Sequence, residues 1–140
     1  MGSTTHVWED YPLAVLYLTG YNQSMWEIEG TDEFAEWFGT LDADSQEDIA
    51  GALELLADEG PQLGRPLVDT VVASRHANMK ELRPSRSIRI LFAFDPRRMA
   101  ILLLGGDKRG QWERWYTVNI PIADARYDEH IETLKKEGLL

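Results

Sequence analysis

A cluster of basic side chains lies between residues 78 and 116 of this 140-residue chain, at the predicted ends and turns of short apolar runs. Its members are Arg83, Arg86, Arg89, Lys108 and Arg109, with Lys80 just before them. The planar fork of arginine matches phosphate oxygens and keeps its charge at any working pH. Three aromatic residues follow, Trp112, Trp115 and Tyr116, and aromatic rings stack on bases. Together these residues predict a surface that binds a ribose-phosphate backbone.

The distribution of charge supports an anion-binding surface. The net charge is -10, but residues 1–64 contain 14 acidic residues and no Lys or Arg, whereas residues 65–115 contain 11 basic and 5 acidic residues. A basic stripe on an acidic body is typical of proteins that bind an anion. Two alternatives remain open: the two zones neutralise each other in the fold, or the cations are solvated turn charges beside core tryptophans.

Other chemistries find little support in the sequence. The chain has no cysteine, which excludes disulfides and thiolate zinc sites and suits a reducing cytoplasm. His6, His76 and His130 lack metal-ligand spacing, so we expect no metal and no cofactor. Residues 105–108 lack the glycine spacing of a phosphate-binding loop. No apolar run is long enough to span a membrane, so we expect a cytoplasmic protein.

Two consecutive helices are predicted in the acidic half, after a short strand near residues 25–30. Thr31 suits an N-cap, and an apolar stripe with the spacing i, i+3, i+4, i+7 follows it. The stripe consists of Phe34, Trp37, Phe38 and Leu41. A second helix begins near Asp42 or Asp44 and ends at Gly60. The short connection predicts a helical hairpin.

Strands are predicted at residues 78–83, 87–94 and 99–104, with a weaker one at 70–73. Alternation in residues 87–94 predicts a strand with one face in the core. The continuous apolar run at 99–104 predicts a central strand covered on both faces, ended by two glycines.

The register of the first hairpin follows from its hydrophobic pattern. If Leu82 pairs with Ile90 in the core, Arg83 lies opposite Arg89 on the other face, and Lys80 turns toward the core side. Like charges directly opposite cost a sheet roughly 0.2–1 kcal/mol, a penalty that a bound anion removes. We therefore expect the cationic heads to share one patch, unneutralised. We also expect alanine at Arg83 or Arg89 to leave the melting temperature nearly unchanged or to raise it.

A last helix is predicted from residues 119–121 onward, since proline is favoured at a first helical turn. The expected fold is α+β, with the helical hairpin and the C-terminal helix packed on a small, mainly antiparallel, twisted sheet. We expect one domain at residues 25–140 and an N-terminal extension at 1–24, whose deletion leaves a folded domain.

Four segments carry a resemblance to a known family. They read M-K-E-L-R-P at 79–84, I-R-I-L-F-A-F-D-P at 88–96, A-I-L-L-L-G-G-D-K-R at 100–109, and A-x-x-x-Y-x-x-H at 123–130. Over about residues 25–138 the chain resembles the phage-derived Gp49-like branch of the RelE/HigB toxin superfamily. The resemblance implies a RelE-like fold and the toxin of a type II toxin–antitoxin pair. It also implies a metal-independent ribonuclease that cleaves mRNA, usually within the ribosome, and a HigA-type helix-turn-helix antitoxin as partner.

The resemblance also implies site residues. Arg89 matches the superfamily's strand arginine, and Arg83 matches the basic residue that closes the preceding strand. Lys108 or Arg109 matches the basic residue after the last long strand. An aromatic residue near the site in some members corresponds to Tyr116, or less closely to Tyr127. Where some members place a lysine before the first arginine, this chain has Glu81, unless Lys80 substitutes.

In the implied reaction a ribose 2′-hydroxyl attacks the adjacent phosphate, and preplaced arginines stabilise the developing charge. The proton acceptor stays open between Tyr116, Lys108 and the RNA itself, and Lys80, Arg86, Trp112 and Trp115 would contact RNA. The alternative function is a non-catalytic phage or host interaction protein, or a gyrase-directed relative, on the same fold.

Overall fold

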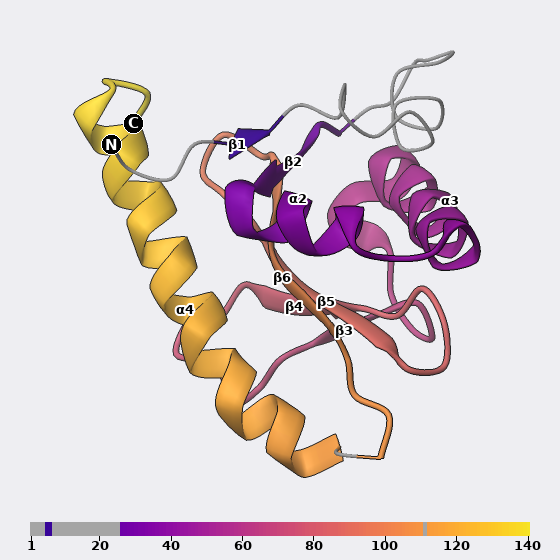
Figure 1. The fold of residues 1–140 in the computed structure, drawn as a ribbon. Coiled ribbons are helices and arrows are strands. Elements are labelled where there is room, and N and C mark those ends of the chain that lie inside the picture. Colours follow the sequence, from indigo (N-terminus) through magenta and orange to yellow (C-terminus); the bar gives the residue numbers. More distant parts are fainter. Residues whose placement is uncertain (1–4, 7–25, 111) are drawn as a thin grey trace.

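The computed structural model describes residues 5–6, 26–110 and 112–140, which form one mixed sheet with helices on both faces (Figure 1). The sheet has six strands in the order β1-β2-β6-β5-β4-β3. Every neighbouring pair is antiparallel except β2 and β6, which run parallel. The expected α+β fold with a mainly antiparallel sheet is therefore confirmed.

The elements follow one another along the chain as two strands, two helices, four strands and a long helix. The strands are β1 (Thr5–His6), β2 (Ile28–Thr31), β3 (Val68–Thr70), β4 (Met79–Leu82), β5 (Ile88–Phe94) and β6 (Ala100–Asp107). The helices are α2 (Asp32–Gly39), α3 (Ala43–Glu59), the short 3-10 helix η2 (Gly60–Gln62) and α4 (Trp112–Lys136).

The predicted helical hairpin is present as α2 and α3. Thr31 caps α2 by accepting a hydrogen bond from the Phe34 N–H at 3.2 Å, and Asp42 caps α3 by accepting one from the Ser45 N–H at 2.9 Å. The apolar faces of both helices pack on one face of the sheet. Members of this first core include Phe34, Phe38, Ile49, Leu53, Leu56, Leu82, Ile90, Phe92 and Leu102.

Helix α4 covers the opposite face of the sheet and builds a second core (Figure 1). This core includes Met79, Leu91, Ala93, Ile101, Leu103, Ile120, Ala123 and Tyr127. The prediction that the last helix begins at residues 119–121 was wrong, because α4 begins at Trp112 and Pro121 lies inside it. Pro121 removes one donor to the preceding turn and crowds a carbonyl of that turn, but the packing of Trp115 and Tyr116 extends the helix toward its N-terminus.

The predicted hairpin register is confirmed, with Leu82 opposite Ile90 in the pairing of β4 and β5. The prediction that β5 buries only one face was wrong, because Leu91 and Ala93 are also fully buried, under α4. The weak strand expected at residues 70–73 lies earlier, as β3 (Val68–Thr70), which pairs with β4.

Two glycines lie inside β6 instead of ending it. A Cβ added to Gly105 would come within 2.2 Å of the Trp37 ring, and one added to Gly106 within 2.5 Å of the Trp115 ring. Each glycine therefore leaves room for a tryptophan, one on each face of the strand. Close approach of another group, rather than a turn, explains both residues.

Most of the expected N-terminal extension, and its boundary at residues 24 and 25, lie outside the described residues. Thr5 and His6 are described and pair with Thr31 and Gly30 at the edge of the sheet. In the described part of the chain, no helix has both the length and the apolar character needed to cross a membrane.

Candidate active site

A buried carboxylate, Glu81, lies at the centre of the predicted cationic cluster. It stands on β4 opposite Leu91 of β5, on the sheet face that α4 covers, and the residue is 5% exposed. A buried carboxylate must be paired or hydrogen-bonded to remain charged. Glu81 meets this condition through two arginines and one tyrosine, which come from three different parts of the chain.

The two arginines approach Glu81 from the two ends of the β4–β5 connection. The Arg83 Nη2 lies 3.3 Å from Glu81 Oε1 and also 3.3 Å from Asp69 Oδ2 on β3. The Arg89 Nε lies 3.3 Å from Glu81 Oε2. The Arg89 Nη1 donates to the carbonyls of Ser85 and Ile88 at 2.9 and 2.8 Å, which fixes the plane of the guanidinium.

Tyr116 and Lys108 complete the cluster from α4 and from the end of β6. The Tyr116 hydroxyl donates to Glu81 Oε2, and burial followed by this hydrogen bond raises the pKa of Tyr116 to about 12. Lys108 is 1% exposed. Burial, followed by repulsion from Arg89, lowers the pKa of Lys108 to about 8. Four of the predicted catalytic residues are thus brought together.

The remaining predicted site residues lie around this cluster or away from it. Arg86 and Arg109 are exposed, and Arg109 forms an ion pair with Asp107 at 2.8 Å. Trp115 packs against Tyr116 and the second core, and its contact with RNA stays a prediction. Lys80 pairs with Phe92 on the face of the first core, opposite to Glu81. Trp112 begins α4, and its side chain lies outside the described part of the chain.

The expectation that the cationic heads stand unneutralised was wrong for Arg83, Arg89 and Arg109, because each contacts a carboxylate. The sequence contained the signal for Glu81. Since side chains alternate along a strand, placing Arg83 on the α4 side also places Glu81 there. In the sequence analysis Glu81 stood only for the lysine of other family members, and its pairing with the arginines was not predicted.

The aromatic alternative, Tyr127, lies in a different environment. Its hydroxyl accepts a hydrogen bond from Asn78 Nδ2 at 3.2 Å, and its ring contacts the His76 ring at a centroid distance of 4.9 Å. Burial raises the pKa of Tyr127. It belongs to the packing of α4 against residues 74–78, so Tyr116 is the tyrosine of the cluster.

A second charged cluster lies at the other end of β5. Asp95 accepts from His130 Nε2 at 2.9 Å and from Arg97 Nη2 at 2.8 Å, and Arg97 Nη2 also contacts Glu29 at 3.2 Å. Burial opposes ionisation of Asp95, but hydrogen bonds from His130 and Arg97 outweigh it and lower the pKa of Asp95. Met99 donates its N–H to the same carboxylate.

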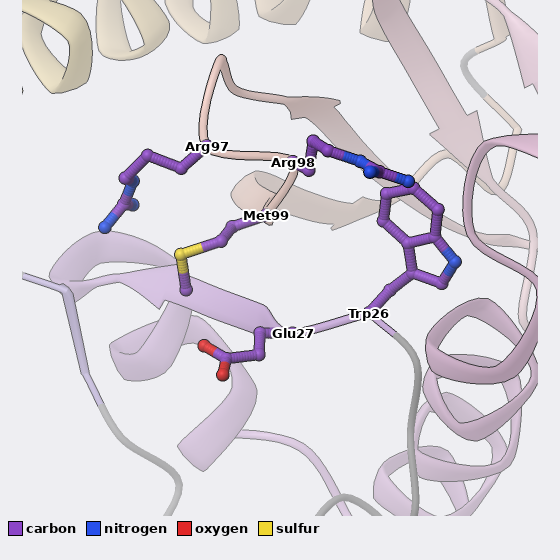
Figure 2. Close-up of a pocket in the computed structure, with 5 residues that line it drawn as sticks. All are labelled: Trp26, Glu27, Arg97, Arg98 and Met99. Carbon is purple, nitrogen blue, oxygen red and sulfur yellow. The ribbon is translucent and has the colours of Figure 1, made fainter. Parts of the chain in front are cut away.

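A pocket of about 470 Å³ opens beside this second cluster, lined by Trp26, Glu27, Arg97, Arg98 and Met99 (Figure 2). The Arg98 guanidinium lies over the Trp26 ring (Figure 2). Its carbon is 4.4 Å from the ring centroid. Arg98 has a φ of 71° in the turn after β5. The Arg97 side chain points away from that stack. Within the described residues, no group of three His, Asp or Glu side chains could hold a metal ion.

The arrangement of the elements is that of a RelE-like fold: a mixed sheet between two helices and a C-terminal helix, with Arg83 and Arg89 flanking the β4–β5 turn and Lys108 after β6. The profile of one family, described as "Phage derived protein Gp49-like (DUF891)", matches residues 36–128. The chain belongs to this phage-derived Gp49-like family, and the resemblance seen in the sequence is confirmed.

Two relatives from Mycobacterium tuberculosis carry toxin names. The chain is 64% identical to "Putative toxin HigB3" over 91 residues, which cover 64% of this chain and 80% of that protein. It is 49% identical to "Putative toxin HigB2" over 104 residues, which cover 71% of this chain and 52% of that protein. The chain thus spans about half the length of the second relative.

Proposed function

We propose that this protein is the toxin of a type II toxin–antitoxin pair and that it cleaves mRNA on the ribosome, in the cytoplasm, without a metal ion. Its partner is a HigA-type helix-turn-helix antitoxin. The observation that carries the proposal is the convergence of Arg83, Arg89, Lys108 and Tyr116 around Glu81, in a chain 64% identical to a protein with a HigB toxin name.

The charges in this cluster suit phosphoryl transfer. In the cleavage step the ribose 2′-hydroxyl gives its proton to a phosphoryl oxygen of the RNA, and its oxygen bonds to phosphorus. The bond from phosphorus to the 5′-oxygen of the next nucleotide breaks, that oxygen takes up a proton, and negative charge grows on the phosphoryl oxygens in the transition state. Guanidinium groups held in place before the reaction stabilise that charge at little reorganisation cost. Glu81 and the carbonyls of Ser85 and Ile88 hold Arg89 in this way. Glu81 is therefore a positioning residue in the proposed site.

Lys108 is the strongest candidate for proton transfer. A pKa of about 8 leaves Lys108 mostly protonated at neutral pH, yet able to give up its proton within the working range. It therefore suits the general acid that protonates the leaving 5′-oxygen. Tyr116 has a pKa raised to about 12 and donates its hydroxyl hydrogen bond to Glu81. It therefore stays protonated at neutral pH and is less suited than the RNA itself to accept the 2′-hydroxyl proton.

One observation favours the second candidate function, a non-catalytic interaction protein on the same fold. Arg89 and Lys108 are 7% and 1% exposed, and the arginines already contact carboxylates. A substrate phosphate must compete with Glu81 for Arg83, whose side chain is 33% exposed. If that competition fails, the cluster serves stability and the basic rim formed by Arg86 and Arg109 serves binding.

Controlled expression in a bacterial host separates the two functions. The toxin proposal predicts growth arrest and loss of intact transcripts on induction, both prevented by co-expression of the antitoxin. Arg83→Ala is expected to abolish both effects while the protein remains folded. Continued growth with intact transcripts after induction of the wild-type chain would contradict the proposal and favour the interaction protein.

A further inference from the structure

A groove beside the candidate active site lies between residues 71–77 and the first half of α4. It encloses about 250 Å³, and its lining residues come from the loop and the helix. They are Ala73, Tyr116, Thr117, Ile120, Pro121 and Asp124. None of the proposed catalytic residues except Tyr116 belongs to this groove.

Tyr116 joins the groove to the cationic cluster. It lines the groove, and its hydroxyl donates to Glu81, which contacts Arg83 and Arg89. A ligand in the groove therefore lies one side chain away from the groups that would hold a phosphate. In RNA, a base and its phosphate are separated by one ribose, which fits this arrangement.

The walls of the groove suit a flat ring with a polar edge. Ala73, Ile120 and Pro121 offer apolar surface, and bases stack on such surface and on aromatic rings without needing a particular sequence. Asp124 provides the polar side as an acceptor, because a carboxylate has about four acceptor positions. Ser74 Oγ and the Arg75 N–H occupy one position on each oxygen. The ligand edge that faces Asp124 must therefore donate a hydrogen bond, as amino and imino groups of bases do.

The groove is preformed because ion pairs fix the loop to α4. Arg75 and His76 both contact Asp128, with His76 Nε2 at 2.9 Å from Asp128 Oδ1. The volume of the groove, about 250 Å³, lies below the roughly 300–1,000 Å³ of sites for drug-sized ligands. This size fits one base better than a folded segment of a partner protein.

We infer that this groove binds the nucleobase next to the cleaved phosphate and gives the enzyme a base preference at that position. The inference rests on the proposed ribonuclease function. Its test therefore needs one measurement that does not depend on cleavage and one that does.

Binding is measured by NMR titration of the full chain with the four nucleoside monophosphates, with ribose 5-phosphate as the probe that lacks a base. We expect saturable shifts at Ala73, Thr117 and Asp124 with at least one nucleotide and not with ribose 5-phosphate. Thr117→Trp fills the groove from an exposed position and should abolish these shifts. Val72→Trp, at a neighbouring residue that is 91% exposed, should retain them. No saturable shift, or equal shifts with ribose 5-phosphate, would overturn the inference.

Cleavage is measured by sequencing transcript 5′ ends after induction. We expect a base preference beside the cut for the wild type and Val72→Trp, reduced about tenfold or more in Thr117→Trp while cutting persists. An unchanged base preference in Thr117→Trp would refute the inference that the groove binds a base. If Thr117→Trp kept its base preference but the antitoxin no longer protected cells from it, the groove would instead be a binding site for the antitoxin. If the wild type cuts no transcript, the proposed function fails, and the titration alone decides whether the groove binds a base.

Discussion

The two ends of β5 carry two charged clusters that differ in their balance of charge. At the end near Asp95, two carboxylates meet two basic side chains: Asp95 contacts His130 and Arg97, and Arg97 also contacts Glu29. At the start of β5, Glu81 is shared by Arg83 and Arg89, and Arg83 also contacts Asp69. Lys108 adds a third cation, and burial followed by repulsion from the arginines lowers its pKa.

This difference distinguishes a structural cluster from a candidate active site. A buried ion pair whose hydrogen bonds are complete has few donor or acceptor positions left for a ligand. A buried set in which cations exceed carboxylates keeps unused attraction for an anion, and such perturbed groups gather at functional sites. Both clusters attach α4 to the sheet, through Tyr116 at one end and His130 at the other. Four substitutions test whether only one of them also performs chemistry.

Of these four substitutions, Arg89→Ala is expected to have the largest effect. Removing this arginine should reduce transcript cleavage by about 10²–10³, and it should cost about 3–5 kcal/mol of stability because Glu81 loses a buried partner. Urea unfolding measures the stability. The double variant Arg89→Ala/Glu81→Gln should recover stability without recovering cleavage. Cleavage that returns together with stability would show that Arg89 has only a structural role.

Asp95→Ala tests the opposite end. It leaves His130 and Arg97 without their shared carboxylate, so we expect a loss of about 3–5 kcal/mol in the free energy of unfolding. Cleavage per folded molecule should stay within a few-fold of the wild type. A loss comparable to that of Arg89→Ala, in protein shown to be folded by circular dichroism, would remove the distinction between the clusters.

Lys108→Met should change how stability depends on pH. The pKa of Lys108 is about 8 in the fold and 10.5 in the unfolded chain. Between these values the unfolded state binds more protons, so stability rises with pH. Above about pH 10 the raised pKa of Tyr116 reverses the trend, because the unfolded state then releases the tyrosine proton first.

The variant should therefore be more stable than the wild type at pH 7, by about 1–3 kcal/mol, and lack the rise between pH 8 and 10. Thermal unfolding at a series of pH values measures both effects. Parallel curves for the two proteins would mean that Lys108 titrates normally.

Arg109→Ala should have the smallest effect. Its side chain is 79% exposed, and its ion pair with Asp107 is on the surface. Such pairs contribute about 0–1 kcal/mol, so the melting temperature should barely move and cleavage should fall less than tenfold. A hundredfold loss would assign the role of the basic residue after β6 to Arg109 instead of Lys108.

The sequence predicted most of the fold because local signals agreed with one another. Caps, apolar stripes and the Leu82–Ile90 register led to the correct helices and hairpin. The start of α4 and the end of β6 were wrong for one reason: Pro121 and the two glycines looked like boundaries. Long-range contacts, such as Trp37 on Gly105 and Trp115 on Gly106, determine where these two elements begin and end.

Four of the predicted catalytic residues lie together, but the charge balance around them was not predicted, and their role in catalysis stays a prediction. Arg83, Arg89, Lys108 and Tyr116 do lie together. The pairing of Glu81 with both arginines depends on side-chain reach across two strands and a helix, which spacing alone does not determine. The same pairing revises the expectation that alanine at Arg89 leaves stability unchanged.

The central claim is that Arg83 acts on RNA and does not merely balance carboxylates. Primer-extension mapping of transcripts after induction tests it most directly, comparing the wild type with Arg83→Ala and Arg65→Ala. Arg65 is the matched control, since it contacts the same Asp69 and its side chain is 77% exposed. We predict discrete breaks with the wild type and Arg65→Ala and intact transcripts with folded Arg83→Ala. Identical breaks in all three proteins would contradict the account.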